Sequence, residues 1–333
     1  MRFRMSLCSA AMALLILPGV ASAAGPDARD ATLDGASEVP AVATAATGDG
    51  WVVISSDNTT VTYFVEYSGL SGALAAAHIH TGAPGVAGGV ILPLAAGPSP
   101  MFGTLTSADF KPSGSVTTFA EALAAIRGGT TYFNLHTAAN PGGEIRGNLT
   151  GTAEALEATI DGAQEVPAVA TAATGNGLAV ISSDGTSVGY AVTYGGLSGA
   201  LAAAHIHTGA PGVAGGVILP LAAGPSPMFG TLTSADFKPS GSVTTFAEAL
   251  AAIRGGTTYF NLHTAANPGG EIRGQIGAAA APTPTGTQPA TSTESPIDPN
   301  GAGSALPALT SLFIVAAVGV LAGGRRLSSR RTR

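Results

Sequence analysis

The sequence predicts an all-β protein with two tandem domains of β-sandwich or barrel type, each carrying one short helix, and a C-terminal transmembrane helix. Three observations predict this fold class. The chain repeats itself after 127 residues. Each copy consists of short β-branched and aromatic runs separated by Gly and Pro, which is the pattern of many short strands. Close to the C-terminus, 20 consecutive residues carry no charge.

Residues 1–23 have the pattern of a secretory signal peptide. Two arginines precede an apolar run at 7–17, and small residues end the segment at Ala23. Cleavage there removes Cys8, the only cysteine of the chain. We therefore expect an exported mature protein that has neither disulfides nor cysteine-ligated metal.

The repeat defines the domain organisation. A shift of 127 residues superposes residues 31–147 on residues 158–274 without a gap. From residue 69 to residue 147 the two copies are identical at every position. A unit of this length has the normal size of a domain and is too long for a solenoid repeat. We predict one domain at 28–150 and a second at 155–277, joined by a short connection.

The part in which the copies differ predicts one strand directly. Between residues 57 and 68 the copies agree at the odd positions and differ at the even ones. A β-strand with one free face shows this alternation, because successive side chains point to opposite sides. We expect Val61, Tyr63, Val65 and Tyr67 to face the core, and Thr60, Thr62, Phe64 and Glu66 to face outward.

Composition and turn signals predict the remaining elements of each copy. Thr118 and Glu121 form a capping-box pattern in front of a helix-favouring run, which the glycine pair at 128–129 ends. The Asn-Pro-Gly-Gly loop at 140–143 predicts a hairpin between its two flanking strands. Besides the strand at 57–68, we expect strands at 51–55, 76–80, 90–94, 130–137 and 144–149.

The C-terminal part predicts a membrane anchor. Residues 278–304 are rich in Pro, Thr, Ser and Ala and predict a stalk that holds the domains off the membrane. As a helix, the uncharged residues 305–324 span about 30 Å, one bilayer core. Five arginines in 325–333 predict a cytoplasmic tail. This end also resembles a cell-wall sorting signal, but the Thr-Gly pair of the sortase pattern is missing. We therefore expect a retained anchor in the cell membrane, with both domains outside.

The charge distribution fits this topology. All 20 acidic residues but only seven of the 14 Lys and Arg lie between Asp27 and Asp298, so this part carries a net charge of −13. Because nucleic acids are themselves polyanions, we expect no nucleic acid partner. The expected partners are the membrane, through the C-terminal helix, and an extracellular ligand or surface that the sequence does not identify.

Three motifs, taken together, resemble the CHRD domain, which is named after chordin. The resemblance covers nearly all of both copies, and it implies a compact extracellular β domain. It does not imply growth-factor binding, which in chordin is attributed to other modules. The motifs are Asp-Gly-Ala-Ser-Glu-Val-Pro at 34–40, His-Ile-His-Thr-Gly at 78–82, and the stretch from Asn134 to Gly147, and they recur at 161–167 (with Gln164 in place of Ser37), 205–209 and 261–274.

Three histidines in each copy are the candidates for chemistry. His78 and His80 flank Ile79 on a predicted strand, so both imidazoles lie on the face opposite Ile79. His136 lies on the polar face of its own strand. A His-x-His pair on a strand can chelate copper or zinc, and Cu/Zn superoxide dismutase uses a similar pair. The candidate metal ligands are His78, His80, His136, His205, His207 and His263, with Glu144 and Glu271 as carboxylates that orient the rings.

Three hypotheses of function follow from these features. The first is a non-enzymatic binding or adhesion module at the cell surface, repeated so that two linked sites gain avidity. The second is an extracytoplasmic copper- or zinc-binding protein that uses the histidines. The third, a metal-dependent redox or hydrolytic enzyme, needs an open coordination position as well. The sequence contains no Gly-x-Ser-x-Gly motif, phosphate-binding loop or Cys–His pair, so we expect no enzyme. The histidines could instead have a structural role, in which they hydrogen-bond Glu144, Asn134 or loop carbonyls.

Overall fold

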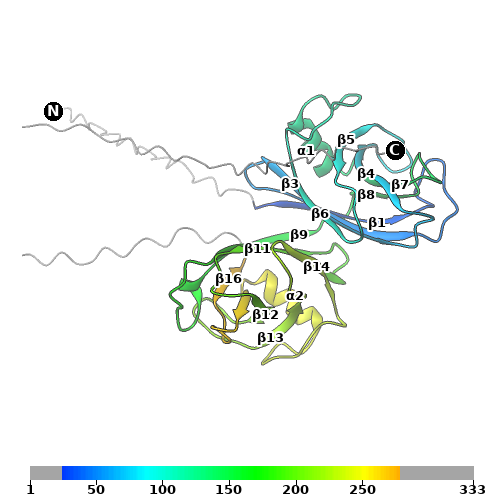
Figure 1. Ribbon diagram of the computed structural model, residues 1–333. Coiled ribbons are helices and arrows are strands. Elements are labelled where there is room, and N and C mark those ends of the chain that lie inside the picture. The colour runs from blue at the N-terminus through cyan, green and yellow to red at the C-terminus, as the bar shows by residue number, and fades with distance from the viewer. Residues whose placement is uncertain (1–24, 278–333) are drawn as a thin grey trace, which may run out of the picture. The chain divides into compact units, whose positions relative to one another are not determined.

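The computed structural model describes residues 25–277, which contain both copies of the repeat (Figure 1). The expected signal peptide (1–23), stalk (278–304), transmembrane helix (305–324) and basic tail (325–333) lie outside the described residues. Within 25–277, no helix is long and apolar enough to cross a membrane.

The first domain consists of eight strands and one helix. Its strands pair antiparallel in two sheets of four, ordered β6-β3-β2-β1 and β8-β7-β4-β5. A single residue pair, Asp34 with Arg146, joins the two sheets at one corner. The elements are β1 (Asp27–Asp34), β2 (Thr47–Ile54), β3 (Thr60–Ser68), β4 (Leu74–Thr81), β5 (Val90–Leu94), β6 (Met101–Thr106), α1 (Phe119–Arg127), β7 (Thr131–Thr137) and β8 (Ile145–Asn148).

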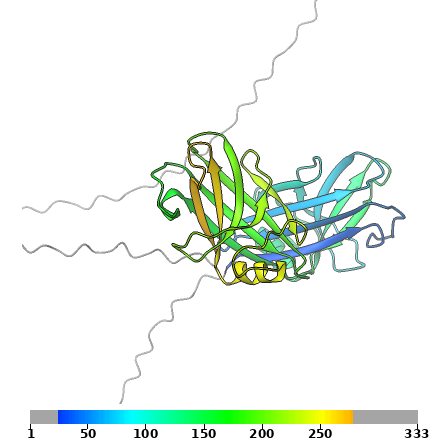
Figure 2. The ribbon, with the colours of Figure 1, turned by 90° about the horizontal axis from the view of Figure 1, so that it is seen from below.

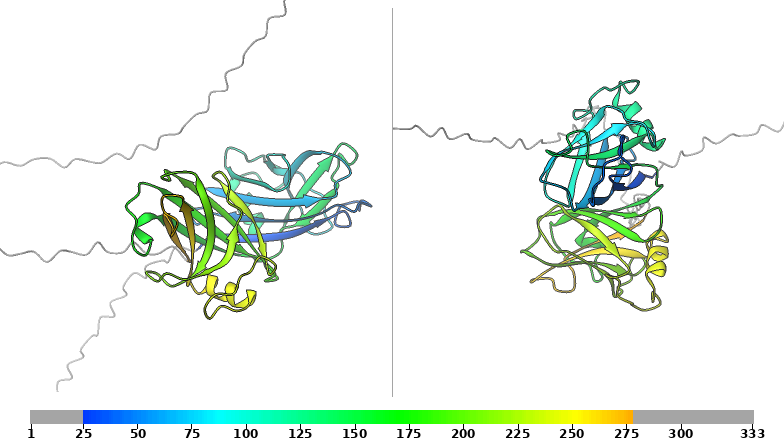
Figure 3. Two further views of the ribbon diagram at one scale, coloured as in Figure 1. Left: turned by 60° about the horizontal axis from the view of Figure 1, so that its bottom comes forward. Right: turned by 90° about the vertical axis from the view of Figure 1, so that its right-hand side faces the viewer.

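The second domain repeats this topology. Its sheets are ordered β14-β11-β10-β9 and β16-β15-β12-β13, and Asp161 with Arg273 is the joining pair. The views in Figures 2 and 3 show α2, in yellow, at the edge of its strands. The elements are β9 (Glu154–Asp161), the 3₁₀ turn η1 (Gly162–Gln164), β10 (Thr174–Ile181), β11 (Ser187–Gly195), β12 (Leu201–Thr208), β13 (Val217–Leu221), β14 (Met228–Thr233), α2 (Phe246–Arg254), β15 (Thr258–Thr264) and β16 (Ile272–Ile276).

The core of each domain lies between its two sheets, which confirms the expected all-β sandwich-like domains. In the first domain, Val61 and Val65 of β3 meet Ile79 of β4 and Phe133 of β7 in one buried cluster. Removing apolar side chains from water in this way is the dominant favourable contribution to folding. Helix α1 adds three side chains from one face, Ala122, Leu123 and Ile126.

The predicted helix and its cap are confirmed. The side chain of Thr118 accepts a hydrogen bond from the backbone N–H of Glu121, and the Glu121 carboxylate accepts from the backbone N–H of Thr118. This reciprocal pair satisfies two of the N–H groups that a helix start leaves without partners. The hairpin prediction is confirmed too, since the loop at 140–143 connects β7 to β8.

Two strands and one strand face differ from the expectation. The strands β1 (DARDATLD) and β6 (MFGTLT) are not among the expected elements, because β1 contains a single β-branched residue and no aromatic one, and the short β6 is interrupted by Gly103. Phe64 was expected to face outward and is only 1% exposed. It belongs to a third buried cluster, in which Trp51 and Phe64 of the first domain meet Val180 and Ala191 of the second. The free face of β3 is therefore an interface between the two domains.

Candidate metal centre

Two neighbouring strands bring the three histidines of the first domain together. In the antiparallel ladder of β4 and β7, His80 pairs with Tyr132, His78 with Asn134, and Ala76 with His136. Cross-strand partners point to the same side of a sheet, so all three imidazoles share one face. The apolar residues between them face the core, as Ile79 shows with 0% exposure. The predicted cluster is thus formed, and one ring nitrogen of each histidine lies within 4.8 Å of the others.

Two backbone carbonyls fix the tautomers of two of these rings. The carbonyl oxygen of Gly88 lies 3.0 Å from Nδ1 of His80, and that of Pro141 lies 3.1 Å from Nδ1 of His136. A carbonyl oxygen only accepts, so both Nδ1 atoms must carry the proton, and each neutral ring keeps its lone pair on Nε2. Histidines that bind metals are held in this way. Nε2 of His80 is buried and has no hydrogen-bond partner.

The third ring completes the cluster. Nδ1 of His78 lies 3.1 Å from Nε2 of His136. Because Nε2 of His136 carries a lone pair, this contact is a hydrogen bond when His78 holds its proton on Nδ1. When the proton moves to Nε2 of His78, a metal ion can take the place of that proton, and Nδ1 of His78 and Nε2 of His136 then both act as ligands.

Burial keeps all three histidines neutral. His80 and His136 are buried, and His78 is half-buried, so the cluster opens to solvent at His78. Burial, together with charge on the neighbouring His136 and His80, lowers the pKa of His78 to about 4. Burial also lowers the pKa values of His80 and His136 below the ordinary value. The neutral form, which a metal ligand requires, therefore dominates at pH 7.

The comparisons with known proteins concern the domain as a whole. The family model of the CHRD domain matches residues 29–149 and again residues 156–276. The chain belongs to the CHRD domain family. This confirms the resemblance that the sequence motifs indicated. No curated protein and no solved structure matches the chain.

An arginine and a tyrosine support His80 within the first CHRD domain. The imidazole of His80 stacks on the ring of Tyr132, with centroids 5.0 Å apart and an angle of 21° between the planes. The guanidinium of Arg146 lies 3.5 Å from the centroid of the same tyrosine ring. One nitrogen of Arg146 donates to two carbonyls of the loop 82–89, each at 2.9 Å. The same loop contains Gly88, so Arg146 and Tyr132 hold in place the carbonyl that sets the tautomer of His80.

Glu144 does not orient the histidine rings, contrary to the expectation for it and for Glu271. Burial opposes ionisation of Glu144, but hydrogen bonds from Ser71, Thr137 and Thr44 outweigh it and lower its pKa to about 2. Thr137 follows His136 on β7, so its side chain points away from the histidine face. Glu144 thereby fastens β7 to the neighbouring loops, and Glu271 does the same in the second domain.

Glu38 is a buried group near the cluster that the sequence analysis did not assign to the site. It lies in the loop after β1 and is 7% exposed. Its carboxylate and the side chain of Asn134 both lie next to Gly143. Burial raises its pKa to about 7, although the charge of Arg146 acts against this. A Cβ atom at Gly143 would lie 2.3 Å from Oδ1 of Asn134 and 2.5 Å from Oε1 of Glu38. Both oxygens lack a hydrogen-bond partner. The only sequence signal was the Ser37-Glu38-Val39-Pro40 part of the CHRD motif.

The second CHRD domain contains the same centre. Nδ1 of His205 lies 3.1 Å from Nε2 of His263, and Nδ1 of His207 lies 3.0 Å from the carbonyl of Gly215. The pKa of His205 is again lowered to about 4, chiefly by burial. Nε2 of His207 is buried without a partner, as in the first domain. Each chain therefore offers two equivalent histidine clusters.

Proposed function

We propose that each CHRD domain is a non-enzymatic binding module whose ligand is a copper or zinc ion, so that one chain holds two ions. One observation carries this proposal. In both domains, backbone carbonyls hold two imidazoles in the tautomer that presents Nε2, and a third imidazole meets them with all ligand nitrogens within 4.8 Å.

The orphaned nitrogen of His80 argues for a ligand and against a purely structural role. A buried polar atom without a hydrogen bond costs roughly 1–3 kcal/mol. A histidine whose task is only to connect strands is expected to use both nitrogens, as His136 does with Pro141 and His78. A metal ion between the rings would give the buried lone pair of His80 its partner.

The donor set indicates which ions fit. Three neutral imidazole nitrogens suit copper and zinc, whereas calcium and magnesium require oxygen ligands. Zinc–nitrogen bonds of about 2.0–2.1 Å in tetrahedral geometry place the nitrogens about 3.4 Å apart. The three ring nitrogens, which lie within 4.8 Å of one another, must therefore move together by up to about 1.4 Å when an ion binds. The half-exposed side of His78 leaves room for a further ligand from solvent.

We further propose that these sites face the outside of the cell. The signal-peptide pattern, the stalk and the apolar segment with its basic tail support this location. A surface module with two linked metal sites also gains avidity for any partner that can bind both ions at once.

Calorimetric titration of the full-length chain with Zn(II) and with Cu(II) tests the proposal. All six histidines of the chain belong to the two clusters, so the chain provides its own matched controls. The parent should bind two ions. A His78→Ala/His80→Ala variant and a His205→Ala/His207→Ala variant should each bind one, and the combined variant none. Two ions bound by the combined variant, or none by the parent, would refute the proposal, provided that circular dichroism shows all variants folded.

A further inference from the structure

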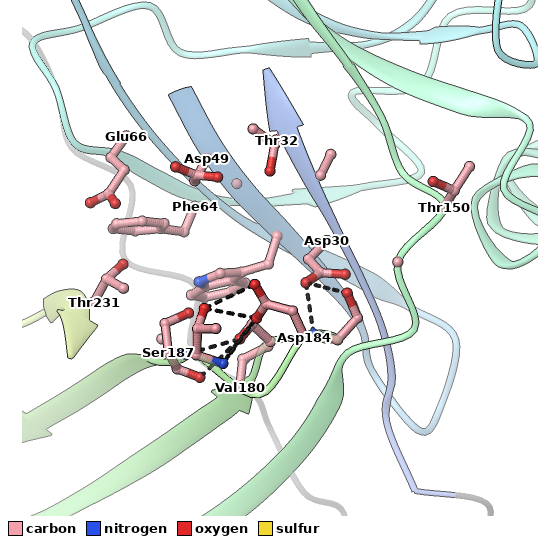
Figure 4. Close-up of a pocket in the computed structure, with 18 of the residues that line it drawn as sticks. Asp30, Thr32, Asp49, Phe64, Glu66, Thr150, Val180, Asp184, Ser187 and Thr231 are labelled. Carbon is pink, nitrogen blue, oxygen red and sulfur yellow. Dashed lines mark hydrogen bonds between the residues drawn. The ribbon is translucent and has the colours of Figure 1, made fainter. Parts of the chain in front are cut away.

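A cavity of about 680 Å³ lies between the two domains and involves none of the six histidines (Figure 4). Pockets of this size are typical of small-molecule sites, which often lie at domain interfaces. Four carboxylates from both domains line it: Asp30, Asp49 and Glu66 of the first, and Asp184 of the second. No lysine, arginine or histidine is among the lining residues.

The carboxylates of this cavity lack compensating charge. Burial raises the pKa of Asp49, and the negative charges of Asp184 and Asp30 raise it further. Burial and the charge of Asp49 act on Glu66 in the same direction. One oxygen of Asp30 accepts hydrogen bonds from Ser183, whereas the other, Oδ1, is buried without a partner. A cation in the cavity would relieve this repulsion.

Aromatic rings form another wall of the same cavity. Trp51 and Phe64 both line it, and their rings stack 5.5 Å apart at an angle of 12°. Trp51 is 6% exposed, and its indole N–H has no acceptor. Its nitrogen, Nε1, lies close to Gly189, which also lines the cavity: a Cβ atom at Gly189 would lie 2.3 Å from it. The cavity thus holds a buried, unpaired hydrogen-bond donor beside its acidic groups.

These features favour an organic cation over a metal ion. Within residues 25–277, only the two histidine clusters bring three possible metal-binding side chains within reach of one ion. No three of the cavity's carboxylates can therefore bind one ion together. Alkylammonium groups suit both walls, because they pair with separate carboxylates and are attracted to aromatic faces.

The two copies of the repeat differ at the residues that create the cavity. Asp49, Trp51, Phe64 and Glu66 of the first copy correspond to Asn176, Leu178, Ala191 and Thr193 of the second. The histidine clusters, in contrast, are identical in both. The cavity is thus formed once per chain, and it needs both domains.

We propose that this interdomain cavity binds a ligand through alkylammonium groups, supplied by a free polyamine or by the lysine side chains of a peptide. The ammonium groups pair with Asp49 and Glu66 beside the stacked rings of Trp51 and Phe64. A lysine peptide also carries carbonyl oxygens that can accept from the indole N–H of Trp51, which a polyamine lacks. This proposal does not depend on metal binding by the histidines.

Trp51 is the only tryptophan of the chain, so its fluorescence reports on the cavity directly. The full-length chain is titrated at low ionic strength with spermidine in one arm and with trilysine in the other. Saturable fluorescence changes at one ligand per chain are expected, with trilysine binding more tightly. Magnesium chloride of equal charge concentration is the control for ionic strength, since magnesium prefers oxygen ligands to imidazoles. Copper and zinc, which could fill the histidine clusters, are left out.

The second copy supplies the variant that tests the site. Asp49→Asn and Glu66→Thr introduce the residues that this fold already carries at positions 176 and 193. Together they should weaken binding at least about tenfold, because two of the four nearby opposite charges are lost. Glu157→Gln removes a charge that does not line the cavity and should leave affinity unchanged. The proposal is overturned if neither ligand changes the fluorescence, if magnesium reproduces the change, or if the double variant binds like the parent.

Discussion

Replacing Glu38 and Glu165 with glutamine removes two carboxyl groups whose ionisation the fold resists. Burial raises the pKa of each from 4.5 to about 7. Protonated glutamate is favoured in the folded domain, so its contribution to stability is complete below pH 4.5 and is lost as the pH rises through 7. At about 1.4 kcal/mol per pKa unit, this loss amounts to about 3 kcal/mol per domain at pH 8.

Glutamine has the same shape and does not ionise, so the double variant avoids this loss. The difference in unfolding free energy between the variant and the parent should therefore be about 3 kcal/mol per domain larger at pH 8 than at pH 4.5. Urea unfolding at both pH values measures the difference, and the histidines contribute equally to both proteins. Parallel stability curves across this range would refute the reasoning.

Three further predictions concern the metal centre and the helix. Metal affinity should stay constant from pH 8 down to pH 6.5, the ordinary pKa of histidine, and fall only in more acidic solution, because burial lowers the pKa values of all three histidines, that of His78 to about 4; calorimetry from pH 4 to pH 8 checks this, and a loss of affinity that begins above pH 6.5 would contradict it. Arg146→Lys should weaken metal binding in the first domain by about tenfold, because a lysine cannot keep both the ring contact and the two loop carbonyls; the second domain, with Arg273 intact, is the control in the same titration. Thr118→Ala should lower the unfolding free energy by about 1 kcal/mol through loss of the helix cap, and an unchanged urea midpoint would show that the cap contributes nothing.

Local sequence patterns predicted the structure correctly where an element is determined by its own residues. The alternation of conserved and changed residues in β3 placed Val61 and Val65 in the core correctly, because side-chain direction in a strand depends only on position. The capping box of α1 was equally readable, since its hydrogen bonds join residues three apart. The strands β1 and β6 were missed because they are defined by pairing with β2 and β3 rather than by their own composition.

The candidate site was predicted only in part for a similar reason. His78 and His80 share a face by local alternation, and this is visible in the sequence. That His136 meets them depends on the register of β7 against β4. The tautomers depend on carbonyls of two loops, which no residue pattern encodes. Glu144 was misassigned because the hairpin turns its side chain toward Thr137 and away from the histidine face.

By itself, the sequence determined the all-β class, the two tandem copies, the CHRD family and the six histidines, because these features follow from composition, period and local spacing. The tertiary structure alone decided which ring nitrogens face one another, where Glu38 lies, and that Trp51 and Phe64 are covered by the second domain. Those features arise from contacts between residues far apart in the chain, and these contacts form only when sheets, loops and domains pack together.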